Sequence, residues 1–392
     1  MAPDSRELNR STVLTELLRR RPISRRDIAN TTGVSAATVT RTVEQLLADG
    51  IVREDREVKT EARGRRAVLL DLVADRAAVV GVDLGASNTR LIVSDFTGRP
   101  LVAQSLPTAT DLDAAALARW LTGVITALAG PTWPRVTVVG VGIPGAVRSN
   151  NGSITNAPNL PQVEDRDFVA TLHRRLGRDL LIDNDANYAL LGELRFGAAR
   201  SSSTAAMLTI GTGLGVGLAI SGRLLQGRNG IVGEFGQLPV GPLGARLEHM
   251  VTGPGILRRA AEAGVSLDDP AELFLPTSDS SRLHLRQLFD QALLIVLTAV
   301  AVSCDPDCIV LGGRVGTQVG ADTARDRAGM EATLAVSPTI PVSELGEFSG
   351  AAGAVAAGLQ RSYRDLGAHD HALVDLPAGS ALTVARVNAA LR

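Results

Sequence analysis

Hydrophobic positions recur at helical spacing along the first part of the chain, and polar residues separate the stripes. The first stripe predicts one buried face of a helix and consists of Leu8, Val13, Leu14, Leu17 and Leu18. Pro22 ends this helix because proline cannot continue the backbone hydrogen-bond pattern. Ser24 and Asp27 form a capping-box-like start for a short helix over residues 25–30. Two helices joined by a proline turn are therefore expected.

A third helix and two apolar segments follow. Ser35 caps this helix, which ends at residues 49–50. Residues 51–52 and 67–72 are predicted strands on either side of a charged loop, residues 54–66. Three helices followed by a two-stranded wing are typical of a winged helix-turn-helix, whose second helix lies in the DNA major groove. Three-helix units also serve as protein-binding modules, and the pattern alone leaves that alternative open.

The expected DNA-binding domain covers residues 1–75, and its candidate contacts are hydroxyls, arginines and one alanine. Hydroxyls and arginines donate to phosphates or base edges, and an alanine can touch a thymine methyl group. The predicted recognition helix contributes Ser35, Ala37, Thr38, Thr40 and Arg41, the bracing helix contributes Arg25 and Arg26, and the wing contributes Arg63, Arg65 and Arg66. The wing arginines could enter a minor groove or hold phosphates.

From residue 77 onward, short apolar runs alternate with helical segments. The runs occupy residues 78–82, 89–94, 136–141, 180–182, 205–209, 215–220 and 308–311. This alternation predicts an α/β fold class. Because glycine-ended strands recur in both halves, we expect two related lobes around a cleft, residues 76–182 and residues 183–392. A final helix within the last residues is expected to return to the first lobe.

Polar residues lie at the ends of three predicted strands. The predicted phosphate-binding residues occupy two glycine-rich turns and are Asp83, Gly85, Ser87, Gly211, Thr212 and Gly213. Between these turns, another strand ends in a cluster that includes Asn184 and Asp185. An aspartate there can act as the general base for a sugar hydroxyl, and the same cluster can cap the helix that follows. The two roles are compatible.

Several motifs occur in the order typical of the ROK family, which groups repressors, open reading frames and kinases. They are Gly64-Arg65 in the wing, the turn at 83–87, G-x-G-x-P-G at 140–145, N-A-P-N-L at 156–160, N-D-A-N at 184–187, the turn at 211–215, G-E-F-G at 233–236 and V-L-G-G at 310–313. The chain therefore resembles the regulator branch of this family over almost its whole length. The resemblance implies an N-terminal winged helix-turn-helix followed by a two-lobed actin/hexokinase-like ATPase fold.

The resemblance also implies roles for individual residues. In family kinases, the aspartate that matches Asp185 takes the proton from a sugar hydroxyl, and the glycine turns hold ATP phosphates. The positions implied to bind a sugar are Asn156, Asn159, Asn184, Asp185, Glu234, Gln237 and Glu248. Ser87 and Asn88 stand where the kinases usually have threonine and lysine, which weakens the inference that ATP binds.

The family's zinc motif is missing from the sequence. Family members usually carry a histidine and then a cluster C-x-C-G-x-x-G-C-x-E, which together hold structural zinc. Gln237 occupies the histidine position here, and residues 240–248 contain no cysteine. Zinc requires three or four thiolate or imidazole ligands. The sequence therefore predicts no metal and no cofactor, with ATP and Mg²⁺ needed only by a kinase.

Composition narrows the class of protein. The chain has 392 residues, of which 45% are hydrophobic and 21% charged, enough for a sizeable core. Two cysteines fit a reducing, cytoplasmic location, and the longest apolar run, residues 292–304, is too short to span a bilayer. The first 76 residues hold 15 Lys+Arg and 12 Asp+Glu, whereas the whole chain has a net charge of −1. This mild asymmetry permits a nucleic-acid-binding head without establishing one.

Three functions are compatible with these features. The expected one is a DNA-binding transcriptional regulator, a repressor, controlled by a sugar or sugar derivative in the cleft. Its expected partners are double-stranded operator DNA, that effector and a second copy of the chain, as a homodimer or a dimer of dimers on a palindromic operator. The first alternative is an ATP-dependent sugar kinase with an accessory DNA-binding head and Asp185 as base. The second is a regulator that senses no sugar.

Overall fold

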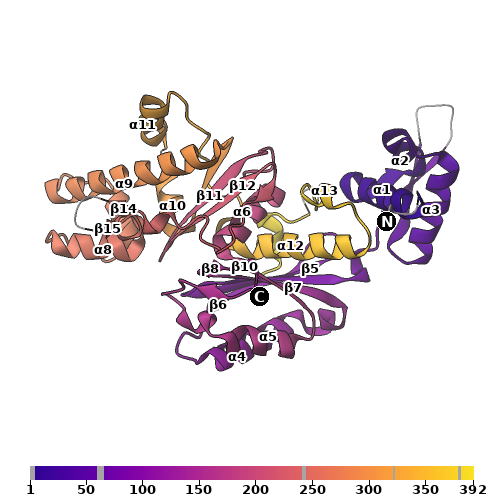
Figure 1. Cartoon of the computed structure of the whole chain (residues 1–392), viewed down its shortest axis with the longest axis horizontal. Helices are drawn as coiled ribbons and strands as arrows, with labels where there is room; N and C mark the ends of the chain where they lie inside the picture. The colour runs from indigo at the N-terminus through magenta and orange to yellow at the C-terminus, as the bar shows by residue number, and fades with distance from the viewer. Residues whose placement is uncertain (1–4, 60–65, 241–243, 321–322, 378–380) are drawn as a thin grey trace.

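The computed structural model describes residues 5–59, 66–240, 244–320, 323–377 and 381–392, and the side chains of residues 56–66 lie outside that description. The chain forms an N-terminal head and two lobes (Figure 1). In Figure 1 the head, in indigo, lies at one end of the molecule and the second lobe, in orange, at the other. The first lobe lies between them, below the long helix α12.

The head contains three helices and a small sheet, as the hydrophobic pattern predicts. Its elements are α1 (Ser5–Arg20), β1 (Ile23–Ser24), α2 (Arg25–Thr32), α3 (Ala36–Ala48), β2 (Val52–Lys59) and β3 (Arg66–Leu72). Ser24 Oγ accepts the Asp27 N–H at 3.2 Å, and Ser35 Oγ accepts the Thr38 N–H at 3.2 Å, so both predicted caps are present. Strand β2 continues to Lys59, into the charged stretch that the sequence predicts to be a loop.

The first lobe is a five-stranded sheet of order β10-β7-β4-β5-β6. Its strands are β4 (Ala78–Leu84), β5 (Asn88–Asp95), β6 (Pro100–Pro107), β7 (Val136–Ile143) and β10 (Asp179–Asn184). Helices α4 (Ala114–Ala129) and α5 (Arg166–Leu176) cover one face, and α12 (Ser349–Asp365) covers the other (Figure 1). Because β10 ends at Asn184, the first-lobe sheet extends two residues beyond the expected boundary at residue 182.

The second lobe is a four-stranded sheet of order β13-β12-β11-β16. Its strands are β11 (Ala205–Ile210), β12 (Leu214–Ile220), β13 (Arg223–Leu224) and β16 (Cys308–Gly312). The main helices are α6 (Asp185–Phe196), α7 (Glu248–Val251), α8 (Gly253–Glu262), α9 (Ser280–Cys304), α10 (Gly313–Val319) and α11 (Ala324–Leu334). Alternate residues of β11 face opposite cores: Leu208 packs with α8 and α9, and Met207 packs with α6.

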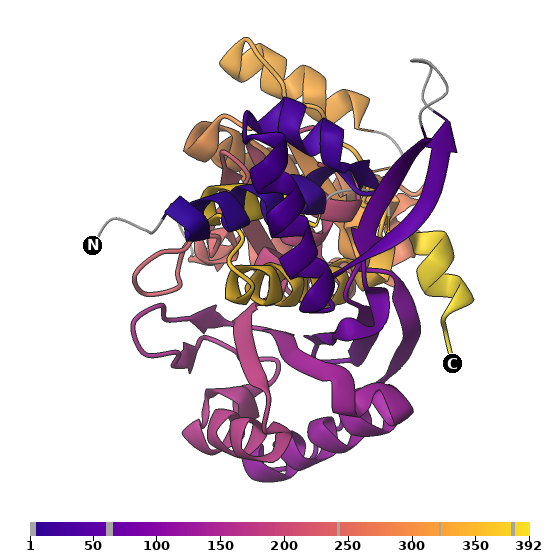
Figure 2. The same ribbon diagram turned by 90° about the vertical axis from the view of Figure 1, so that its right-hand side faces the viewer.

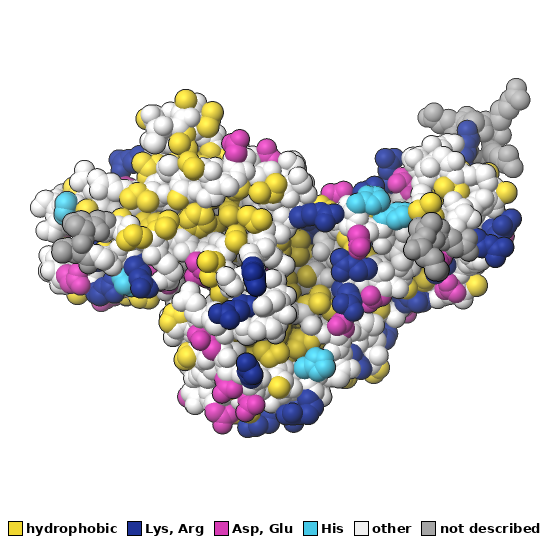
Figure 3. Space-filling view, viewed as in Figure 1, with side chains coloured by type: hydrophobic (Ala, Val, Ile, Leu, Met, Phe, Trp, Pro, Cys, Tyr) yellow, Lys and Arg dark blue, Asp and Glu magenta, His cyan; other side chains and the backbone are white. Residues whose placement is uncertain are grey.

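Two helical segments, Ala114–Arg135 and Ser280–Cys304, are long and apolar enough to cross a membrane by length and composition alone. The second contains the apolar run that the sequence shows, but the helix begins well before that run. Leu293 and Val296 of α9 are fully buried in the core of the second lobe, whereas Val302 is 69% exposed. Figure 3 shows apolar side chains gathered on the surface of this lobe. Core helices of soluble domains have the same length and composition.

The two lobes meet where α6 crosses α12. A Cβ atom on Gly353 of α12 would lie 1.7 Å from the carbonyl oxygen of Tyr188, and one on Gly192 of α6 would lie 2.4 Å from the carbonyl oxygen of Ser349. Both glycines therefore let the two backbones come into direct contact. Since α6 packs on β11 and β12 while α12 packs on β4 and β7, this crossing joins the sheets of the two lobes.

The head packs directly on the body and shares its core. Buried side chains of α1 to α3 and of α12 belong to one continuous hydrophobic cluster. Arg19 pairs with Asp375 at 3.3 Å, and Arg76 donates to the Asp49 carbonyl oxygen at 2.5 Å. Figure 2, in which the head faces the viewer, shows α1 to α3 in front of α12 and the β2–β3 ribbon pointing away from the body. The head is therefore held on the body by side-chain packing as well as by the covalent connection of the backbone.

The C-terminal residues lie against the first lobe. Helix α13 (Asp370–Leu373) follows α12, and α14 (Val384–Ala389) ends near β6. Ala103 of β6 donates its N–H to Ala390 at 2.8 Å and accepts the Arg392 N–H at 3.0 Å. The last residues therefore form an additional bridge along the edge of the first-lobe sheet.

We predict that Gly353→Ala destabilises the protein because the new methyl group has no space against the Tyr188 carbonyl group. Overpacking of this kind costs about 1–3 kcal/mol, so the Tm should fall by several degrees. Gly123→Ala is the matched control, since a Cβ there, on the exposed face of α4, meets open space. The control should leave the Tm unchanged or slightly higher. Equal melting temperatures for the two variants would contradict the close crossing.

Candidate functional site

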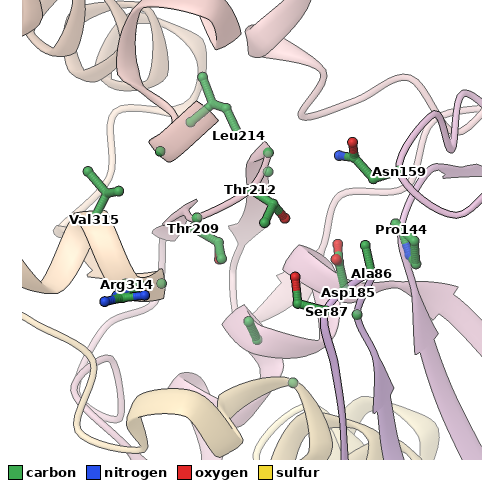
Figure 4. A pocket seen from close by; sticks show the side chains of 18 of the residues that line it. Ala86, Ser87, Pro144, Asn159, Asp185, Thr209, Thr212, Leu214, Arg314 and Val315 are labelled. Carbon is green, nitrogen blue, oxygen red and sulfur yellow. The ribbon is translucent and has the colours of Figure 1, made fainter. Parts of the chain in front are cut away.

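A cavity of about 610 Å³ lies between the two lobes, in the range of small-molecule sites. Every cleft residue predicted from the sequence lines it: Asp83, Gly85, Ser87, Asn156, Asn159, Asn184, Asp185, Gly211, Thr212, Gly213, Glu234, Gln237 and Glu248. Figure 4 shows Ser87 and Asp185 beside each other, with Thr212 and Asn159 around the same space. The structure therefore brings together residues that are far apart in the sequence.

Asn184 and Asp185 lie where β10 ends and α6 begins. Asn184 is the N-cap of α6, because its Oδ1 accepts the N–H groups of Ala186 at 2.9 Å and Asn187 at 3.3 Å. Its Nδ2 donates to the carbonyl oxygen of Gly145 at 2.9 Å. The amide oxygen is thus occupied by the cap, and the NH₂ group is the part of Asn184 suited to meet a hydroxyl.

Two carboxyl groups form the floor of the cavity, at the end of β4 and the start of α6. Burial raises the pKa of Asp185 to about 6, and its hydrogen bond from the Ala186 N–H opposes that rise. Burial, and then the negative charge of Asp185, raises the pKa of Asp83 to about 7, whereas Arg90 lowers it. A carboxyl group with a pKa near neutrality can accept a proton or a hydroxyl hydrogen bond at physiological pH.

The residues predicted to bind a sugar come from both lobes. Asn156 has φ = 61°, a left-handed conformation that asparagine tolerates, and it belongs to a loop of the first lobe. Its Nδ2 donates to Glu234 Oε2 of the second lobe at 2.8 Å, so this bond crosses the cleft. Burial raises the pKa of Glu234, the charges of Glu248 and Asp185 raise it further, and the bond from Asn156 lowers it.

A tight turn delivers Glu234 to the cavity. Gly233 has φ = 96°, and a Cβ atom there would lie 2.0 Å from the carbonyl oxygen of Val216. Only glycine fits this position. The next residues form the 3₁₀ helix Phe235–Gln237, and Gln237 Nε2 donates to Glu248 Oε2 at 3.3 Å. The carboxylates and amides on this side of the cavity suit pairs of adjacent sugar hydroxyls.

The glycine turns use some of their own N–H groups internally. The Gly85 N–H donates to the Asn88 carbonyl oxygen at 3.1 Å, and the Gly211 N–H donates to the Gly213 carbonyl oxygen at 3.0 Å. These two N–H groups are therefore not free for a phosphate, because each closes a tight strand-to-strand turn. The hydroxyls of Ser87 and Thr212 remain on the lining of the cavity.

Two ion pairs that no sequence motif indicates lie at the cavity. Arg90 of β5 pairs with Glu347 at 3.0 Å, and Arg314 of α10 pairs with Asp269. Arg90, Glu347 and Arg314 all line the cavity. No motif marks these residues, and each pair joins segments that are distant in the chain. Only the fold could reveal them.

Metal-binding geometry is not found in the part of the chain that the structure describes. Among those residues, no group of three or more His, Cys, Asp or Glu side chains is arranged to hold a metal ion. Cys308 is buried at the start of β16 and Cys304 is partly buried at the end of α9, away from the residues predicted to bind a sugar.

The residues predicted to contact DNA all belong to the head, but they differ in exposure and in the partners they already have. Ser35, Ala37, Thr40 and Arg41 of the α3 region are exposed, as is Arg26, whereas Thr38 is partly buried. Arg25 pairs with Glu54 of β2 at 2.9 Å, so this arginine already fastens α2 to the wing. Arg63 and Arg65 lie outside the described residues. Arg66 begins β3, and its side chain is not described.

Comparison with known families separates an N-terminal DNA-binding region from the rest of the chain. A model of winged helix-turn-helix DNA-binding domains matches residues 8–53, and a model of the ROK family matches residues 79–360. The chain is 30% identical to the xylose repressor of Caldicellulosiruptor bescii over 238 residues. That match covers 60% of this chain, and the chain spans 59% of the length of that relative.

Solved structures share the fold. A ROK hexokinase from Thermus thermophilus is 28% identical with a TM-score of 0.64, and the match covers 74% of this chain and 99% of the hexokinase. A ROK family transcriptional regulator, a homologue of the Escherichia coli MLC protein, is 20% identical with a TM-score of 0.73. This second match covers 94% of this chain and 100% of the regulator, head included. Since the ROK family model matches more than half of the residues, the chain belongs to the ROK family.

Proposed function

We propose that this protein is a cytoplasmic, sequence-specific transcriptional regulator, a repressor, whose affinity for DNA is set by a sugar or sugar derivative bound between the lobes. One observation carries the proposal: the DNA-binding head shares a continuous core with α12, the helix whose N-terminal end lines the cavity. A ligand that changes the position of α12 would therefore act on the head. The similarity to a xylose repressor supports the same conclusion.

Helix α6 provides a second connection between the cavity and the head. It begins at Asp185 on the cavity floor, and Arg195 lies in its last turn. Burial lowers the pKa of the Arg195 guanidinium, and the carboxylate of Asp375 opposes that effect. Asp375 also pairs with Arg19 of the head at 3.3 Å. The charge of Asp375 thus acts on one arginine of the body, and its carboxylate pairs with one arginine of the head.

Ligand control requires unequal affinity for two states. A sugar can shift DNA binding only if it binds the DNA-competent and the DNA-incompetent arrangements with different affinities, and DNA must then change sugar affinity by the same factor. We expect these two arrangements to be a more open and a more closed cleft, related by a hinge motion of the two lobes. A homodimer would place two heads on the two halves of a palindromic operator.

Sugar binding is tested by a thermal-shift screen of pentoses, hexoses and N-acetylhexosamines. We expect at least one sugar to raise the Tm, and Glu234→Ala to abolish the shift because it removes a carboxylate that lines the cavity and the bond to Asn156. Glu262→Ala, at an exposed position of α8 (side chain 66% exposed), is the control and should keep the shift. A regulator that senses no sugar would show no shift in the wild-type protein.

DNA binding is tested on an operator selected from random duplexes. Arg41→Ala should weaken binding by about 1–3 kcal/mol, the cost of losing one base contact, because Arg41 is exposed on the predicted recognition helix. Arg258→Ala, in α8 of the second lobe, should leave the affinity unchanged. Fluorescence anisotropy at fixed salt gives both values. Unchanged binding in Arg41→Ala would place the recognition surface elsewhere.

A sugar kinase is the second candidate, because Asp185 lies at the start of α6 with a pKa raised to about 6, as a general base requires. ATP turnover over the same sugar panel, compared with Asp185→Asn, distinguishes the candidates. A kinase would lose turnover in this variant, and the wild-type rate would fall as the pH drops below about 6, since protonation removes the base. We expect no Asp185-dependent turnover.

A further inference from the structure

The sugar side of the cavity is built on residues 233–240 and 244–248, here termed the sugar-side segment. In the ROK family this region is organised by zinc, and the residues of this chain do not fit that ion. Gln237 replaces the histidine, and the two cysteines of the sequence, Cys304 and Cys308, lie in another part of the fold. An amide is a poor zinc ligand compared with thiolate or imidazole. Another interaction must hold the segment.

A chain of polar contacts occupies this place. Arg246 Nη1 donates to Gln237 Oε1, and Gln237 Nε2 donates to Glu248 Oε2 at 3.3 Å. Arg246 is exposed and does not line the cavity, whereas Gln237 and Glu248 do. The guanidinium therefore acts on the cavity only through the amide of Gln237.

The backbone places Arg246 beside Gln237. Strands β14 (Pro239–Val240) and β15 (Ala245–Arg246) pair antiparallel, with Pro239 opposite Arg246. The Leu247 N–H donates to the Leu238 carbonyl oxygen at 3.0 Å, which continues the ladder toward Gln237. Arg246 thus returns to the start of the hairpin, two residues from Glu248, where α7 begins.

The two charged neighbours fix the orientation of the Gln237 amide. Its oxygen must face the guanidinium, because arginine only donates, and its NH₂ group must face the carboxylate, because an ionised carboxylate only accepts. A flipped amide would lose both bonds. Hydrogen bonds to ionised partners are also stronger than those between neutral groups. Gln237 therefore presents its NH₂ group at a defined position on the cavity lining.

The same chain of contacts brings positive charge to an acidic surface. The charges of Glu248 and Asp185 both raise the pKa of Glu234, so each of these two carboxylates repels that of Glu234. The Arg246 guanidinium reaches this acidic group through the Gln237 amide, which contacts both Arg246 and Glu248. In a zinc-bearing relative the metal ion would supply positive charge in the same region.

We propose that Arg246 is a positioning residue that, through Gln237, orders the sugar-side segment without a metal ion. The effect on sugar affinity rests on the proposed function above, whereas the effect on the order of the segment does not. Hydrogen–deuterium exchange of the ligand-free full-length protein therefore tests the proposal separately.

The exchange experiment compares the backbone amides of residues 235–240 and 244–248 in four proteins. Arg246→Ala should exchange about 5- to 10-fold faster in this segment, because local opening no longer breaks a charge-assisted hydrogen bond. Arg246→Lys, which can still donate to Gln237, should restore most of the protection. Arg223→Ala, at an exposed position of β13 for which the described contacts include no side-chain bond, is the matched control and should match wild type. Wild-type exchange in Arg246→Ala would overturn the proposal.

The same exchange measurement tests whether a metal ion orders the segment. Dialysis of the wild-type protein against a chelator, and addition of Zn²⁺ afterwards, should leave the exchange of the segment and the Tm unchanged. Loss of protection on chelation, regained with Zn²⁺, would show that a metal ion orders the segment and would overturn the proposal.

A double-mutant cycle separates positioning from general weakening. With the sugar found in the thermal-shift screen as probe, Arg246→Ala and Gln237→Ala should each reduce affinity, and the double variant should resemble Gln237→Ala alone. Additive losses would mean that Arg246 does not act through Gln237. If no sugar binds the wild-type protein, the proposed function fails, while the exchange experiment still decides the role of Arg246.

Discussion

The backbone contact between α6 and α12 is the constraint on which the other parts depend. Gly192 and Gly353 allow the two helices to touch without side chains between them, and each helix covers the sheet of a different lobe. The cavity exists because the lobes diverge from this crossing. The head is positioned by the same helix, since its core is continuous with that of α12. This one packing interaction therefore determines where the cleft lies, how the two lobes are arranged and where the DNA-binding head packs.

The two buried carboxyl groups on the cavity floor lower the stability of the ligand-free protein at neutral pH. Folding raises the pKa of Asp83 to about 7 and that of Asp185 to about 6, so the folded state binds protons more tightly than the unfolded state. These two groups therefore favour folding at acidic pH, and their contribution is lost as the pH rises through 6 and 7. At neutral pH the protein retains buried charges that weaken it. Such a cost is expected at a binding site, where a ligand's hydroxyl groups can satisfy the carboxylates.

Local patterns in the sequence predicted the three helices of the head, seven strands of the body and thirteen of the residues that line the cavity. The stripe around Leu14 and the cap at Ser35 require only neighbouring residues, and the two glycine turns mark where β4 and β11 turn back into antiparallel neighbours. The pairs Arg25–Glu54 and Arg90–Glu347 could not be predicted, because each depends on how distant segments meet. The wing strand β2 also extends into a charged stretch, since pairing with β3 outweighs its weak strand propensity.

Asp185 and Arg195 occupy the two ends of one short, straight element. Ten residues of α-helix span about 15 Å, and α6 packs along its length against α12 and β12. A tilt of about 10° at the cavity end would displace the far end by about 3 Å, from that length. The charge of Asp375 acts on Arg195, and Asp375 also pairs with Arg19 of the head at 3.3 Å. The length of α6 would thus turn a small tilt at Asp185 into a larger displacement at the arginine on which the Asp375 charge acts.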